Sequence, residues 1–105
     1  LAARGFGGNH SLCHGDLGNL EVLLQLAGRF GVDAWRELSL QHATRVAREV
    51  LDRRWLCGLP RHAETPGLML GTAGIGWGLL SLAHPGRVPS ALSLDGPPTP
   101  AAPLR

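Results

Sequence analysis

The sequence contains no lysine and only two cysteines, Cys13 and Cys57. Arginine therefore supplies all 10 basic residues, and 8 acidic residues reduce the formal net charge to +2. So small an excess does not indicate a nucleic-acid-binding protein, which needs basic side chains clustered on one face. Two cysteines are also too few for the disulfide framework of a small secreted scaffold, so we expect reduced thiols in a cytoplasmic protein.

The chain is too short for more than one domain, since it has 105 residues. Hydrophobic residues make up 44% and charged residues 17%, a composition that favours folding over disorder. The first residue is leucine rather than methionine, and we therefore expect the chain to be part of a longer reading frame. We predict a folded region over residues 1–94 and a disordered, proline-rich tail over residues 95–105.

An uncharged stretch over residues 65–86 has the length of a membrane span, which needs about 20 residues. However, Pro66 and Pro85 shorten the helix that this stretch can form, and no basic flank sets an orientation. We therefore expect a buried helix here and no membrane span.

No segment shows the alternating pattern of a strand, whereas three segments have helical periodicity, so we predict an all-α fold. The first helix should begin at about Asn19, as its N-cap, and end between Gly28 and Gly31. Val22 and Leu26 widen its apolar stripe, so this helix should be buried on more than one side.

The second helix should be capped by Asp33 and end near Arg53, and the third should span about Leu68 to Ala83. The second helix is amphipathic. Its apolar face comprises Ala43, Val46, Ala47, Val50 and Leu51, and its charged face comprises Arg45, Arg48, Glu49 and Asp52. We interpret the charged face as a solvated outer surface.

The most specific local pattern is the pair Cys13-His14, followed by Gly15 and Gly18 where a loop enters a helix. Thiolate and imidazole are preferred ligands of zinc. Adjacent residues point about 100° apart on a helix, so both can reach one ion only on irregular backbone, which the glycines permit. The pattern alone leaves open a buried cysteine beside a hydrogen-bonded histidine, and two ligands fall short of the three that a catalytic zinc needs.

Other polar residues have less specific roles. Asp16 could accept a hydrogen bond from a ligand or cap a helix, and His10 is a candidate polar neighbour of the pair. Cys57 could be a third ligand, but a core thiol is the simpler interpretation. His62 and His84 are expected in solvated turns.

A glycine-rich stretch begins the third helix. Its order over residues 71–76 is Gly-x-x-Gly-x-Gly, and no strand precedes it, so it does not match the dinucleotide fingerprint. On a helix, Gly71, Gly74 and Gly78 share one face, which allows another backbone to approach closely. That backbone could belong to a neighbouring helix or to an extended peptide.

Five segments, in their order along the chain, resemble the lanthionine cyclase family, in particular the C-terminal end of class II (LanM-type) lanthipeptide synthetases. They are Asn9–Asn19 (NHSLCHGDLGN), Trp55–Pro60 (WLCGLP), Glu64–Met69 (ETPGLM), Gly71–Leu80 (GTAGIGWGLL) and Arg87–Ser90 (RVPS). The resemblance covers nearly the whole chain up to about residue 94.

The resemblance implies an α/α toroid whose inner helices line a cavity with one zinc ion. Cys13 and His14 match two of the three zinc ligands of the family. The third ligand, a cysteine, and the acid/base histidine belong to earlier segments that this chain lacks, as does the dehydratase region. The implied partners are a lanthipeptide precursor peptide and those upstream regions.

The implied reaction adds cysteine thiolates of the precursor to dehydroalanine or dehydrobutyrine and so forms (methyl)lanthionine thioether rings. We expect this chain to contribute part of the site and to be inactive by itself. The alternatives are a non-catalytic module that binds zinc and a thiol peptide, and a helical interaction module.

Overall fold

The computed structural model of the chain describes residues 6–93. They form three α-helices, one short 3-10 helix and no strand, which confirms the all-α prediction for this part of the chain. The proline-rich tail predicted from residue 95 and the boundary at residue 94 lie outside the described residues. None of the helices between residues 6 and 93 is long and apolar enough to cross a membrane.

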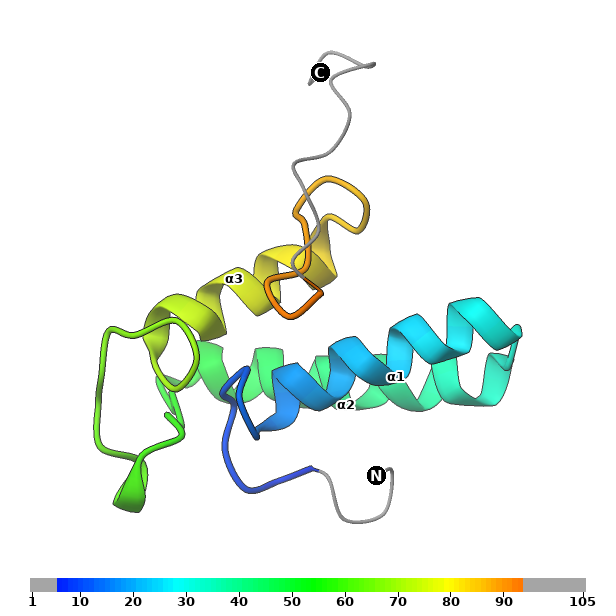
Figure 1. The fold of residues 1–105 in the computed structure, drawn as a ribbon. Coiled ribbons are helices and arrows are strands. Elements are labelled where there is room, and N and C mark those ends of the chain that lie inside the picture. The colour runs from blue at the N-terminus through cyan, green and yellow to red at the C-terminus, as the bar shows by residue number, and fades with distance from the viewer. Residues whose placement is uncertain (1–5, 94–105) are drawn as a thin grey trace.

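Helices α1 (Asp16–Phe30) and α2 (Asp33–Leu51) run antiparallel as a hairpin (Figure 1). Gly31 ends α1 in the left-handed region, with φ 67°, a conformation that favours glycine. Val32, rather than the predicted Asp33, is the N-cap of α2, and no side chain caps that helix. Its end at Leu51 lies two residues before the predicted Arg53, because Arg53 itself adopts a positive φ of 63°.

Helix α1 begins at Asp16 with Gly15 as its N-cap, so the predicted N-cap at Asn19 is wrong. The preceding loop folds back over the helix and supplies the missing acceptors. The amide of Asp16 donates to the carbonyl of Asn9 at 2.7 Å, and a β-carbon at Gly18 would overlap the carbonyl oxygen of Leu12. Backbone carbonyls therefore replace the side-chain cap that the sequence suggested.

Helix α3 (Thr72–Ala83) begins in the same way, with Gly71 as its N-cap. The amide of Thr72 donates to the carbonyl of Thr65 at 2.8 Å, and a β-carbon at Gly74 would overlap the carbonyl oxygen of Leu68. The predicted start at Leu68 is therefore wrong, because residues 68–71 form the turn that leads into the helix. The η1 helix (Pro60–His62) lies in the connection between α2 and α3.

Three loop segments meet where α1 begins and α2 ends (Figure 1). Backbone hydrogen bonds join them. The loop before α1 is bonded to the segment after α2, because the amide of His10 donates to the carbonyl of Leu56 at 2.7 Å. The loop before α3 is bonded to both, because the carbonyl of Met69 accepts the amide of Cys13 at 2.9 Å and that of Leu70 accepts the amide of Gly58 at 2.7 Å. The loops before α1 and α3 are thus fixed side by side against the segment that follows α2.

The core lies between the three helices and extends into this loop junction. Its buried members are Leu12, Leu17, Leu20, Val46, Cys57 and Ile75. A β-carbon at Gly78 would lie 3.1 Å from the β-carbon of Leu17. The close neighbour predicted for the glycine face of α3 is therefore α1 with its preceding turn, which is the neighbouring-helix alternative.

Two packing predictions are wrong within the described residues. Val22 and Leu26 are 44% and 37% exposed, so α1 is not buried on more than one side. Leu51, assigned to the apolar face of α2, is 81% exposed. In each case the elements between residues 6 and 93 leave a large part of the residue exposed.

Candidate metal centre

Cys13 and His14 lie in a non-helical turn immediately before α1. Both residues are exposed, and no side-chain hydrogen bond joins either of them to another described residue. The alternative of a buried cysteine beside a hydrogen-bonded histidine is therefore wrong. The irregular backbone meets the requirement for two adjacent residues to reach one ion.

The surroundings of the pair suit a metal ligand set. A β-carbon at Gly58 would come 3.1 Å from the ring carbon Cε1 of His14, so the missing side chain leaves room for the imidazole. The amide of Cys13 is held by the carbonyl of Met69 at 2.9 Å. A thiol and an imidazole fit zinc by their chemistry, and a pair leaves the remaining positions of a four-coordinate ion to other groups.

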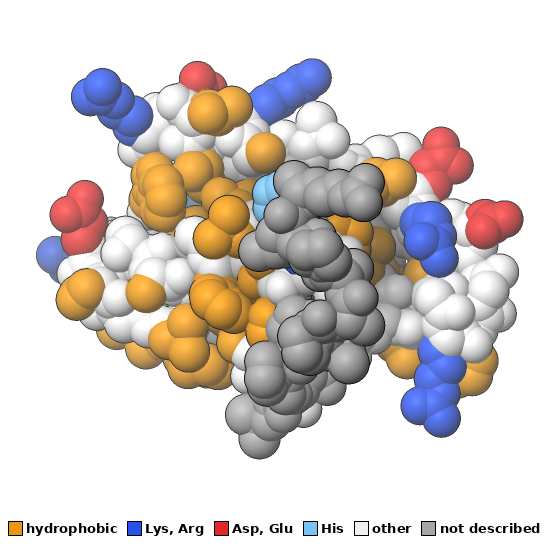
Figure 2. Space-filling model, turned by 90° about the horizontal axis from the view of Figure 1, so that it is seen from above, with side chains coloured by type: hydrophobic (Ala, Val, Ile, Leu, Met, Phe, Trp, Pro, Cys, Tyr) orange, Lys and Arg blue, Asp and Glu red, His pale blue; other side chains and the backbone are white. Residues whose placement is uncertain are grey.

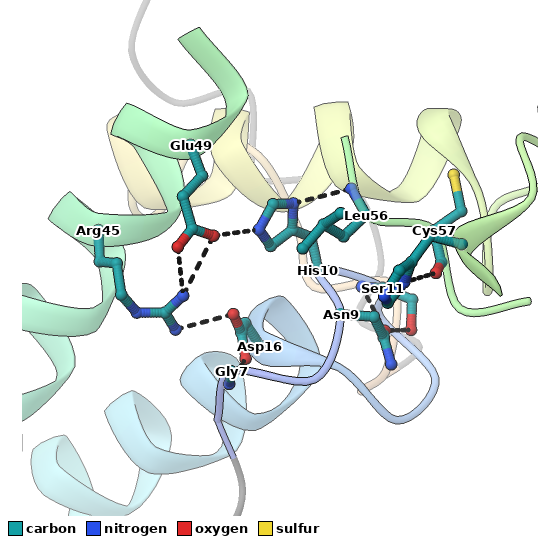
Figure 3. Close-up of polar contacts among 10 residues, drawn as sticks. Gly7, Asn9, His10, Ser11, Asp16, Arg45, Glu49, Leu56 and Cys57 are labelled. Carbon is teal, nitrogen blue, oxygen red and sulfur yellow. Dashed lines mark hydrogen bonds and ion pairs between the residues drawn. The ribbon is translucent and has the colours of Figure 1, made fainter. Parts of the chain in front are cut away.

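A partly buried polar network joins the loop before α1 to α2 (Figure 3). Asp16, at the first position of α1, accepts hydrogen bonds from the amide of Gly7 at 2.7 Å and from the guanidinium of Arg45 at 2.8 Å. Arg45 also donates to Glu49, one turn further along α2, at 3.1 Å. Glu49 in turn pairs with His10 Nε2 at 2.6 Å, so four side chains form one continuous network.

The partners of His10 determine its tautomer. Its Nδ1 accepts the amide of Leu56 at 3.2 Å and therefore carries no proton. Nε2 must then carry the proton and donate it to Glu49. The neutral imidazole, which is fully buried, thus links the loop before α1 both to α2 and to the segment that follows α2.

Electrostatics reinforce this arrangement. Burial raises the pKa of Glu49, but the hydrogen bonds from His10 and Arg45 and the charge of Arg45 together lower it below the ordinary 4.5. Burial lowers the pKa of Arg45, but its bonds to Asp16 and Glu49 raise it above the ordinary value. Both groups are therefore charged at neutral pH.

This network corrects the interpretation of α2. Arg45 and Glu49 were predicted on a solvated outer face, yet both are half-buried and face the loop before α1. The sequence carried one usable signal, because Glu49 follows the buried Val46 by three residues and so borders the buried stripe. The prediction that His10 is a polar group near the pair is consistent with its position in this network. Asp16 does not cap a helix, because its carboxylate bonds to Arg45 and to the amide of Gly7.

The network is not itself a metal site of the predicted kind. Potential ligand atoms of His10, Asp16 and Glu49 lie within 4.8 Å of one another. However, the guanidinium of Arg45 pairs with both carboxylates, so a protein cation already stands where a metal would bind. The exposed pair Cys13-His14 remains the better candidate by its donor chemistry.

The remaining candidates lie where the sequence suggested. Cys57 is fully buried in the core cluster, which confirms that it is a core thiol. His62 and His84 are exposed, and the ring of His62 approaches the Cys57 carbonyl at 3.2 Å.

A family model described as "Lanthionine synthetase C-like protein" matches residues 1–93. The chain belongs to this family. The match includes every described residue, and with them the Cys13-His14 turn and all three α-helices. The resemblance inferred from the sequence motifs is thereby confirmed.

Among curated proteins, the chain is similar to the "Lacticin 481/lactococcin biosynthesis protein LcnDR2" of Lactococcus lactis subsp. lactis. The two are 36% identical over 75 residues, which is 69% of this chain but only 8% of the relative. The chain therefore corresponds to a small part of that protein. No solved structure matches the chain significantly.

Proposed function

We propose that the chain is part of a zinc-dependent lanthionine cyclase that works in lanthipeptide biosynthesis, with Cys13 and His14 as two of the zinc ligands. The observation that carries this proposal is the exposed thiol–imidazole pair on a fixed, non-helical turn. Family membership and the printed role of the relative in lacticin biosynthesis support it. A third ligand, the acid/base group and a dehydratase region would come from elsewhere in the parent protein, meaning the complete translation product that contains these 105 residues.

When bound, zinc would hold the cysteine thiol of a precursor peptide as a thiolate at neutral pH. Cys13 and His14 would present a sulfur and a nitrogen from one turn and leave two positions for a third protein ligand and the peptide thiol. Their exposure leaves both side chains accessible to a peptide, while the Cys13–Met69 backbone bond keeps the turn in place.

The proposed reaction is an addition without net oxidation or reduction. The peptide sulfur forms a bond to the β-carbon of dehydroalanine or dehydrobutyrine, and the electron pair of the double bond moves to the α-carbon. The new sulfur–carbon bond closes the thioether ring. A proton then adds to the α-carbon, which offsets the proton that the thiol lost.

The test uses the parent protein with the variants Cys13→Ala and His14→Ala, and Cys57→Ser as the matched thiol control. Zinc is measured by elemental analysis. Ring formation on a dehydrated precursor peptide is measured as loss of alkylatable thiol by mass spectrometry. We expect both alanine variants to lose most of their zinc and ring formation, because a single protein donor at this turn binds the ion weakly. We expect Cys57→Ser to keep its zinc and to lose only stability.

Full zinc and full ring formation in the two alanine variants would show that the ligand assignment is wrong. Loss of zinc from a folded Cys57→Ser variant would place that thiol among the ligands. A wild-type protein that binds zinc and the peptide but closes no ring would favour the non-catalytic module.

A further inference from the structure

We propose that His10 and Glu49 are positioning residues that fix the backbone of the Cys13-His14 turn for metal binding. The inference rests on the proposed function, because it concerns the same ligand pair. It adds a role for a network on α2 that the ligand assignment itself does not use.

The turn is attached to α2 on both of its sides. His10 lies three residues before Cys13, and Asp16 lies two residues after His14; the side chains of His10 and Asp16 are almost completely buried. Their partners Glu49 and Arg45 are one helical turn apart on α2 and are joined at 3.1 Å (Figure 3). A shift of the turn relative to α2 would therefore break contacts at both ends together.

His10 carries most of this attachment. Its amide donates to the carbonyl of Leu56, its Nδ1 accepts the amide of the same residue, and its Nε2 donates to Glu49. The side chain and the amide of this one residue thus join three segments of chain. Leu56 adjoins Cys57 and Gly58, and Gly58 is the residue that makes room for the His14 ring.

The ligand pair needs an external support of this kind. Because Cys13 and His14 have no side-chain hydrogen bond within residues 6–93, no polar contact of their own sets their direction, and the backbone that carries them must help to do so. A buried ionic network gains little stability over apolar residues of the same size. Its geometry is specific, however, and groups that orient metal ligands commonly change metal affinity about ten- to a hundredfold when removed.

The experiment measures the zinc affinity of the parent protein by competition with a chelator, and the visible spectrum of its cobalt form, which reports ligand geometry. The variants are His10→Ala, Glu49→Ala and the conservative Glu49→Gln, whose amide oxygen can still accept the Nε2 proton of His10. Val46→Ala is the control, because Val46 is a buried apolar residue on the same helix, three residues before Glu49.

We expect zinc affinity to fall about ten- to a hundredfold in His10→Ala and Glu49→Ala, with an altered cobalt spectrum. Glu49→Gln should recover most of the affinity, and Val46→Ala should keep wild-type affinity and spectrum despite a lower melting temperature. Wild-type affinity in Glu49→Ala, or an equal loss in Val46→Ala, would overturn the positioning role while the ligand assignment stands. Should Cys13→Ala keep its zinc, the proposed function fails, and the positioning role fails with it.

Discussion

Glu49 is the residue whose environment departs most clearly from the sequence-based expectation. It joins a neutral, buried histidine to a charged arginine, and burial alone would disfavour its charge. The hydrogen bonds from His10 and Arg45 outweigh burial, so the pKa of Glu49 lies below 4.5 in the folded protein. The folded state therefore binds the proton of this carboxyl less readily than the unfolded chain does.

This difference predicts an acid-dependent loss of stability. Glu49 contributes stability above its unfolded value of about 4.5, and the contribution disappears as the pH falls through its lower folded pKa. We expect Glu49→Gln to melt below the wild type at neutral pH, and the gap to shrink at a pH well below 4.5. Melting temperatures of the parent protein at both pH values provide the measurement.

Glu37→Gln is the control for this prediction, since Glu37 is an exposed acid on the same helix. Neutralising an exposed carboxylate should change stability by less than about 1 kcal/mol. A gap between wild type and Glu49→Gln that widens in acid would contradict the assigned direction of the pKa shift.

The four-residue network also shows which contacts of the candidate site could not be predicted from the sequence. The Cys13-His14 pair and its glycines are adjacent in the sequence, so the pattern was visible without a structure. Glu49 and Arg45, by contrast, lie 39 and 29 positions from their partners His10 and Asp16. Only the packing of α2 against the loop brings them together, and periodicity within α2 cannot indicate which partner its charged side chains meet.

At the scale of elements, the helices were predictable but two of their starts were not. The observed bounds of α2 agree to within two residues at each end with those predicted from its apolar periodicity and capping residue. Helices α1 and α3 instead begin at glycines whose preceding loops supply backbone acceptors. Backbone contacts of this kind, from Asn9 to α1 and from Thr65 to α3, leave no side-chain cap in the sequence, which is why Asn19 and Leu68 were wrong as starts.

The glycines of α3 allow this close approach to be tested. A β-carbon at Gly74 would overlap the backbone carbonyl of Leu68, which cannot move unless the whole turn moves. A β-carbon at Gly76 would meet no atom within 4 Å beyond its chain neighbours and its own helix backbone. We expect Gly74→Ala to destabilise the parent protein by about 3 kcal/mol, at the upper end for overpacking. Gly76→Ala should stabilise it by about 0.5–1 kcal/mol, because alanine loses less conformational freedom in a helix.

Thermal unfolding of the two variants side by side is the measurement. Since both replace a glycine by alanine in the same helix, helix propensity alone would shift both melting temperatures upward. Equal stabilisation by the two substitutions would therefore contradict the close packing of the α3 turn.

At the scale of the whole molecule, a large part of the apolar surface remains uncovered by residues 6–93. Phe30, Leu40, Leu51 and Leu80 are each at least half exposed. Figure 2 shows apolar side chains gathered on the side where α3 lies. A groove of about 360 Å³ also opens between α1, the second half of α3 and the segment that follows it, and its lining includes Leu17, Leu24, Leu82 and Val88. Surface of this extent usually marks a contact with further protein.

From this exposure we predict that residues 1–105 do not form a stable fold by themselves. Val22 and Leu26 of α1 and Leu51 of α2 are exposed although the periodicity of the sequence assigns them to buried faces. Three α-helices cannot cover these side chains as well as their own core. The isolated chain should therefore aggregate, or show helical circular dichroism without cooperative melting and with strong binding of the dye ANS.

Expression of the 105-residue chain, followed by sedimentation, thermal melting and ANS fluorescence, tests the prediction. The matched control is the parent protein, in which the same helices should melt cooperatively and bind little ANS. A soluble monomer of residues 1–105 with one cooperative transition would contradict the prediction. That result would also favour the helical interaction module, because a segment that is stable alone has no need of further helices to cover α1 and α2.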